Sequence, residues 1–164
     1  MQPIDRFALE PHAGPYERWP LDSRLRDGGV ACDARVPGYV IEAQYATPLG
    51  TLLVTSWDCP FEESSSFVLL DDALRVVAHR ELLSPYASWL LDAHWPEGED
   101  TLVLHYQRDA FFRLQVLPPA RWWPRWPRLR LRRVRHWRAE PRMVAAEAAL
   151  VDRLREIGRT LETG

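Results

Sequence analysis

Several residue types are rare or missing in this chain, and each absence excludes a class of protein. Only two cysteines occur, Cys32 and Cys59, which is too few for the disulfide framework of a small secreted domain. No uninterrupted run of about 18 apolar residues is present. The first residues, MQPIDRFALEPHAG, lack the basic start and apolar stretch of a signal peptide. We therefore expect two free thiols and a cytoplasmic protein that does not enter a membrane.

The motifs that mark common active sites are missing as well. The chain has no glycine-rich phosphate loop, nucleophile elbow, HExxH motif or CxxC pair. Cys59 is the best candidate nucleophile, but the acids beside it disfavour the reactive thiolate. A metal site built from His94, Glu97, Glu99 and Asp100 lacks the ligand spacing of zinc and calcium sites. We therefore expect no catalytic residue, no metal and no cofactor.

The chain does contain enough apolar material for one core. Of its 164 residues, 46% are hydrophobic and 27% are charged, which is typical of a single folded domain. All 21 basic residues are arginines, because lysine is absent, and asparagine is absent too. We attribute this bias to a GC-rich bacterial genome, so the number of arginines by itself indicates no function.

The middle of the chain has the pattern of an antiparallel sheet of six or seven strands, from residue 38 to residue 138. Short β-branched and aromatic runs alternate there with turn signals. The last strand is expected from Arg128 to Arg138, and residues 84–100 are expected to be a loop. In the first strand, alternation places four side chains on one face: Tyr39, Ile41, Ala43 and Tyr45. Three hairpins are predicted: 39–47 with 51–57, 67–71 with 74–82, and 101–106 with 111–118.

The two ends of the chain differ from this pattern. Residues 1–37 carry five prolines and no lasting periodicity, which predicts an irregular N-terminal arm. In residues 141–162, apolar side chains recur at steps of three and four, which predicts an amphipathic helix packed on the sheet. The predicted fold class is therefore α+β. It consists of the arm and a single domain, 38–164, made of the sheet 38–138 and the C-terminal helix.

Charge is segregated along the sequence, although the net charge is only −2. Residues 1–104 hold 17 acids and 7 arginines, whereas residues 105–142 hold 2 acids and 11 arginines. The stretch 118–138, PPARWWPRWPRLRLRRVRHWR, contains eight arginines and four tryptophans. If acidic and basic strands lie side by side, these charges pair across the sheet. If they do not, the stretch forms a basic surface, and the sequence leaves both arrangements open.

One segment resembles known proteins. Residues 50–72, GTLLVTSWDCPFEESSSFVLLDD, are similar to a strand, an acidic Cys-Pro loop and a strand in small bacterial proteins, some of which resemble immunity proteins for secreted toxins. The resemblance implies a cytoplasmic protein that neutralises a bacterial toxin by direct binding. It assigns no role to any individual residue.

Two groups of residues are candidates for binding a protein partner. One is acidic and would attract a basic toxin: Asp58, Glu62, Glu63, Asp71 and Asp72. The other combines the residue types most frequent at the energetic centres of interfaces: Trp122, Trp123, Trp126, Arg128 and Arg130.

The main hypothesis is a non-catalytic, protein-binding inhibitor of the immunity type. A first alternative is a nucleic-acid-binding domain that uses residues 121–138, since arginines bind phosphates and tryptophans stack on bases. A second alternative is a small enzyme whose active site is dispersed in the sequence. The sequence leaves the oligomeric state open.

Overall fold

The structure, a computed structural model, describes residues 1–58, 63–83, 88–107, 109–120 and 126–134. Strands account for 62% of these residues and helical turns for 2%. The elements in chain order are β1 (Gln2–Pro3), β2 (Phe7–Leu9), the 3-10 turn η1 (Tyr16–Arg18), β3 (Asp22–Asp27), β4 (Val30–Pro37), β5 (Val40–Thr47), β6 (Gly50–Ser56), β7 (Ser65–Leu70), β8 (Val76–Leu82), β9 (Leu91–Pro96), β10 (Thr101–Tyr106), β11 (Ala110–Leu117) and β12 (Arg128–Val134).

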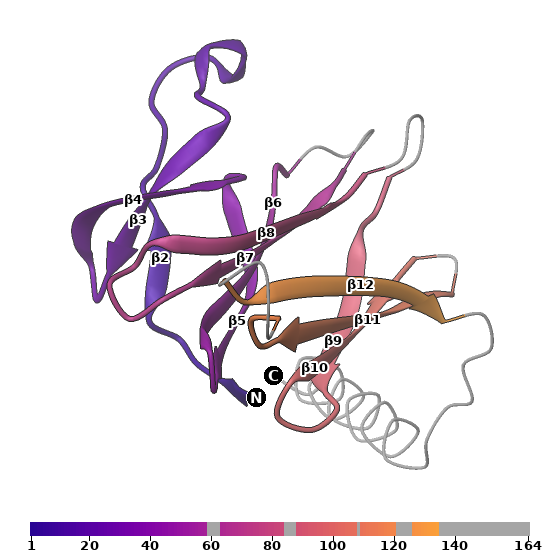
Figure 1. Ribbon diagram of the computed structural model, residues 1–164. Helices are drawn as coiled ribbons and strands as arrows, with labels where there is room; N and C mark the ends of the chain where they lie inside the picture. Colours follow the sequence, from indigo (N-terminus) through magenta and orange to yellow (C-terminus); the bar gives the residue numbers. More distant parts are fainter. Residues whose placement is uncertain (59–62, 84–87, 108, 121–125, 135–164) are drawn as a thin grey trace, which may run out of the picture. The chain divides into compact units, whose positions relative to one another are not determined.

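The strands form three antiparallel sheets (Figure 1). The five-stranded sheet has the order β1-β5-β6-β7-β8, the four-stranded sheet the order β12-β11-β10-β9, and the three-stranded sheet the order β2-β3-β4. Almost all neighbours in a sheet are also neighbours in the chain, because short connections join antiparallel strands directly. The exception is β1, which pairs with β5.

The five-stranded sheet is covered on both faces. On one face, Leu52 and Val54 pack in a cluster with side chains of the four-stranded sheet. On the other face, Leu53 packs with Phe7 and Leu25 of the three-stranded sheet. Every residue of β7 is buried for this reason. Because each fully buried large apolar side chain contributes about 1.5–3 kcal/mol, these two clusters stabilise a three-layered arrangement of sheets.

The hairpin β5–β6 shows how local sequence fixes this arrangement. Thr47 pairs with Gly50 across the two-residue turn. Gly50 has a φ of +124°, and a Cβ at this position would lie 2.0 Å from the carbonyl oxygen of Leu70. Only glycine allows β7 to approach the turn so closely.

The three predicted hairpins are confirmed as β5–β6, β7–β8 and β10–β11. The final strand is confirmed as β12, and its predicted last residues, 135–138, lie outside the described part of the chain. Residues 84–100 were expected to be a loop, but they contain β9, which pairs with β10.

The α+β fold class is wrong, because the described residues are nearly all β and form three sheets instead of one continuous layer. The irregular N-terminal arm is wrong as well, since residues 1–37 contain β1, β2, β3 and β4. Their prolines lie at strand ends, in the edge strand β1 or between β2 and β3, where no ladder hydrogen bond is lost. The predicted helix 141–162 lies outside the described residues, and the domain boundary at residue 38 stays a prediction.

The alternation expected for β5 is also wrong, because a β-bulge interrupts it. Ile41 pairs with Thr55 and Ala43 pairs with Val54, so Glu42 is an extra residue without a partner. As a result Ile41 packs toward the three-stranded sheet, whereas Ala43 and Tyr45 pack toward the four-stranded sheet.

Candidate binding surface

Strand β12 presents a row of arginines on the surface. Leu129 and Leu131 are half-buried and pack against the core between the five- and four-stranded sheets. The alternate residues Arg128, Arg130 and Arg132 are exposed on the opposite face. Side chains two residues apart on a strand are about 6.7 Å apart. The sequence RLRLR therefore folds into a strand with a leucine face turned inward and a regularly spaced basic face turned outward.

In the described part of the chain, no acidic residue lies opposite these arginines on the strand that pairs with β12. Strand β12 pairs only with β11, where Gln115 is opposite Arg130 and Arg113 is opposite Arg132. Arg113 itself is bound by Glu97, with N–O distances of 2.6 and 2.8 Å. Within the ranges that the structure describes, none of the β12 arginines forms an ion pair. The cross-strand neutralisation that the sequence left open does not occur here.

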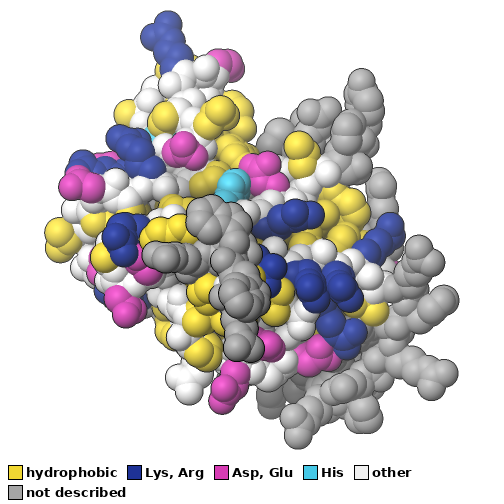
Figure 2. All heavy atoms as spheres, viewed as in Figure 1, with side chains coloured by type: hydrophobic (Ala, Val, Ile, Leu, Met, Phe, Trp, Pro, Cys, Tyr) yellow, Lys and Arg dark blue, Asp and Glu magenta, His cyan; other side chains and the backbone are white. Residues whose placement is uncertain are grey.

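We call Arg128, Arg130, Arg132 and Arg133 the basic edge, since all four are exposed on a strand at the end of its sheet. Arg80 of β8, the last strand of the five-stranded sheet, is exposed nearby, and β8 and β12 lie side by side. Figure 2 shows arginine side chains gathered over the region where Figure 1 places these two strands.

An exposed tryptophan lies between β12 and β8. Trp126 is 55% exposed, and together with Arg75, Val76 and Val77 it lines a shallow pocket of about 210 Å³. The structure describes three of the predicted site residues in this part of the molecule: Trp126 lines the pocket, and Arg128 and Arg130 are exposed on β12. The other two of that group, Trp122 and Trp123, lie outside the described residues.

The acidic group does not form one surface. Glu63 is buried, and its carboxylate accepts hydrogen bonds from the backbone N–H groups of Trp57 (2.9 Å) and Ser64 (3.1 Å). Glu63 therefore stabilises the connection between β6 and β7. Asp58 is exposed at the same end of these strands, and Glu62 lies outside the described residues.

The remaining acids lie at the other end of β7, about 20 Å away along a six-residue strand. The Asp71 carboxylate accepts hydrogen bonds from the side chain of Arg75 (2.8 Å) and from the backbone N–H groups of Ala73 and Arg75. The bond from the Arg75 side chain is the main cause that lowers the pKa of Asp71. Asp71 thus organises the β7–β8 turn, and only Asp72 is exposed there without a described partner.

The sequence analysis missed two hydrogen-bonded side-chain pairs: Tyr45 with His94, which joins the five- and four-stranded sheets, and Ser56 with the exposed Glu42 within the five-stranded sheet. Tyr45 and His94 form a hydrogen bond of 2.6 Å between Oη and Nδ1, and the Ser56 hydroxyl donates to Glu42 at 2.6 Å. Burial lowers the pKa of His94, against the opposing effect of Glu42, and raises the pKa of Tyr45. Burial also raises the pKa of Tyr106. No sequence motif predicts these two pairs, because strand pairing and sheet packing bring their members together from β5, β6 and β9.

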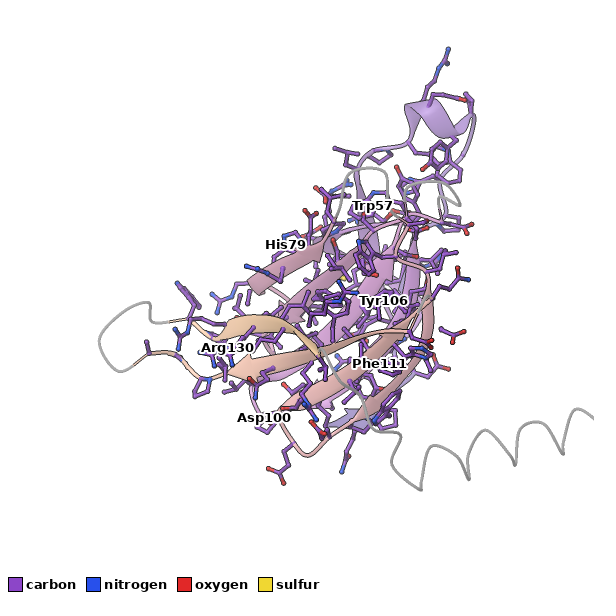
Figure 3. The ribbon with its side chains drawn as sticks, turned by 90° about the vertical axis from the view of Figure 1, so that its right-hand side faces the viewer. Trp57, His79, Asp100, Tyr106, Phe111 and Arg130 are labelled. Atoms are coloured by element: carbon purple, nitrogen blue, oxygen red, sulfur yellow. The ribbon has the colours of Figure 1, made fainter. Side chains whose placement is uncertain are left out.

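Neither of the two shallow pockets found among the described residues reaches these two pairs. The pocket at Trp126 and a second shallow pocket beside Cys32 are lined by other residues. Figure 3 places Trp57 and Tyr106 well apart from Arg130 on β12. An active site normally combines convergent polar groups with a concave pocket, and these two pockets do not supply that combination at Tyr45 and His94.

The described residues hold no group of three or more side chains able to bind a metal ion. His94 is bonded to Tyr45 and Glu97 to Arg113. The same residues include no helix with the length and apolar character needed to cross a bilayer.

Comparison of the chain with known protein families, with curated proteins and with solved structures finds no match. The resemblance of residues 50–72 to immunity proteins therefore stays a prediction, and the function has to be argued from the surface itself.

Proposed function

We propose that this protein is a non-catalytic binding protein that recognises an acidic region of a protein partner through the basic edge. The observation that carries this proposal is the four exposed arginines of β12, three of them in a row on one face, without an ion pair among the described residues. Neighbouring like charges repel one another, so an acidic partner relieves an unfavourable arrangement and also accelerates encounter. Trp126 beside them supplies the large apolar contact that often dominates binding energy.

The specific role that we propose is immunity-type inhibition of a bacterial toxin, in the cytoplasm. In this role the protein binds the toxin directly and needs no chemistry of its own. The proposal predicts that a gene for a large secreted toxin lies beside this gene, and that cells producing that toxin regain growth when this protein is expressed. Failure of the unmutated protein to restore growth would reject the immunity role and leave the binding surface to be tested separately.

The binding surface is tested by charge reversal. Arg130→Glu with Arg132→Glu should weaken binding to fluorescent poly-L-glutamate at least tenfold, measured by anisotropy at about 50 mM salt, where charge interactions are weakly screened. Arg18→Glu with Arg35→Glu is the matched control, because both arginines are exposed and lie outside β12. Equal loss in the two variants would show that only net charge matters and would reject the basic edge.

Nucleic-acid binding is the second candidate, because regularly spaced arginines beside an exposed tryptophan also suit a phosphate backbone. Of the residues described, however, Trp126 is the only large aromatic side chain beside the basic edge that is more than half exposed. A base-stacking surface normally offers several. Tighter binding of a single-stranded oligonucleotide than of poly-L-glutamate, lost in the Arg130→Glu, Arg132→Glu variant, would favour this candidate over the protein partner.

A further inference from the structure

We infer that the partner binds as an extended acidic segment that adds a strand to the edge of β12 that faces away from β11. This inference rests on the proposed function and specifies the partner's conformation and sequence pattern. It concerns the backbone of β12 as well as its side chains, and it therefore predicts more than attraction between opposite charges.

On the side that faces away from β11, the backbone of β12 has no hydrogen-bonded neighbour among the described residues, although β8 lies close to part of the strand. All seven residues from Arg128 to Val134 pair with β11, one by one and without a bulge. In such a ladder the N–H and C=O groups of alternate residues point away from the neighbouring strand. Among the described residues, no backbone hydrogen bond reaches β12 from any strand other than β11, and β8, although close, is not bonded to it. An extended peptide can bind these groups as it binds other sheet edges.

The side chains on the two faces of β12 determine which residue types a bound peptide should carry at alternate positions. Directly opposite side chains on adjacent strands lie on the same face of the sheet and about 4.5–5.5 Å apart. Acids at alternate positions would therefore lie opposite Arg128, Arg130 and Arg132. The intervening residues would lie next to Leu129 and Leu131, which are only half-buried. The partner sequence should thus alternate acidic and apolar residues.

The same charges exclude a second copy of this chain as the occupant. Antiparallel pairing of two β12 strands would place arginines opposite arginines, which is destabilising. Charged edge strands commonly prevent association of this kind. A purely protective role for the arginines is the alternative that the experiment has to separate from strand addition.

The experiment uses the full chain and labelled peptides in an anisotropy titration. The parent peptide is Glu-Val-Glu-Val-Glu-Val-Glu, and its control has the same composition and charge in the order Glu-Glu-Glu-Glu-Val-Val-Val. Strand addition predicts that the parent binds at least tenfold more tightly than the control, and that this difference disappears in the Arg130→Glu, Arg132→Glu variant.

Two N-methylated forms of the parent test the backbone directly. Methyl groups on all valine nitrogens block one edge of the peptide strand, and methyl groups on all the internal glutamate nitrogens block the other edge. We expect the peptide to pair antiparallel with β12, as β11 does. In that orientation only one of these edges faces β12, so one form should lose binding at least tenfold and the other should retain it. Equal binding of the two methylated forms would overturn strand addition, and so would binding of the control peptide as tight as that of the parent. The proposed function would stand in both cases. Absence of binding by poly-L-glutamate and all peptides would instead reject the proposed function.

Discussion

Acidic residues that look alike in the sequence have different roles in the structure. Glu63 is 4% exposed and binds two backbone N–H groups, whereas Asp72 is exposed and has no described partner. A carboxylate that accepts hydrogen bonds in a buried position stabilises the fold more than a solvated one. Only the exposed residue is available to a partner.

Glu63→Ala should lower the free energy of unfolding by about 1.5–3 kcal/mol, because charge-assisted hydrogen bonds to the amides of Trp57 and Ser64 are lost. Asp72→Ala is the control and should change stability by less than about 0.5 kcal/mol. Urea denaturation of the two variants measures the difference. Similar values for both would show that the Glu63 carboxylate does not support the β6–β7 connection.

At the scale of elements, the bulge in β5 decides which residues enter which core. Without it, Ile41 and Ala43 would lie on the same face of the strand. The extra residue Glu42 turns Ile41 toward the three-stranded sheet and keeps Ala43 toward the four-stranded sheet. One inserted residue thus allows β5 to serve both faces of the central sheet.

Deletion of Glu42 should be tolerated, because Ile41 and Ala43 then become consecutive residues and still lie on opposite faces. We expect a loss of about 1 kcal/mol from the missing hydrogen bond with Ser56. Deletion of Ala46, an exposed residue of the same strand, should prevent cooperative unfolding. It shifts the register of β5 by one residue, so side chains that precede Ala46 in the strand, such as Tyr45, turn to the opposite face of the sheet. Circular dichroism during thermal unfolding distinguishes the two variants. Equal damage by both deletions would contradict our account of the bulge.

For the molecule as a whole, the hydrogen bond between Tyr45 of β5 and His94 of β9 links two sheets. Burial lowers the pKa of His94 below its usual value near 6.5. The unfolded chain therefore takes up a proton at this residue before the folded protein does, and the free energy of unfolding falls as the pH drops below about 6.5.

His94→Gln should remove this dependence. The variant should show a flatter profile of unfolding free energy between about pH 7 and pH 5 than the unmutated protein. The carboxylates whose pKa values are lowered by arginines, Asp27, Asp71 and Glu97, lose their contribution only at lower pH. An unchanged slope in the variant, measured by urea denaturation at each pH, would show that another group titrates in this window.

The sequence by itself determined the hairpins and the two faces of β12. Period-two alternation, turn residues and the RLRLR pattern are local, so they specify local pairing and the inward or outward direction of side chains. The sequence also named Trp126, Arg128 and Arg130 as candidates for partner binding, and this assignment stays a prediction.

Only the tertiary structure decided the number of sheets, the strands in residues 1–37, the burial of Glu63 and the pairing of β12, among the described residues, with a strand that has no acid. These features depend on which strands meet across layers. The short, proline-containing strands in residues 1–37 are stable because another sheet covers them. Whether a charged side chain such as Glu63 or Arg130 is buried, paired or exposed depends on residues that are distant in the chain. Local sequence patterns do not show which strands meet across the layers, because the packing of the two core clusters determines which strands meet.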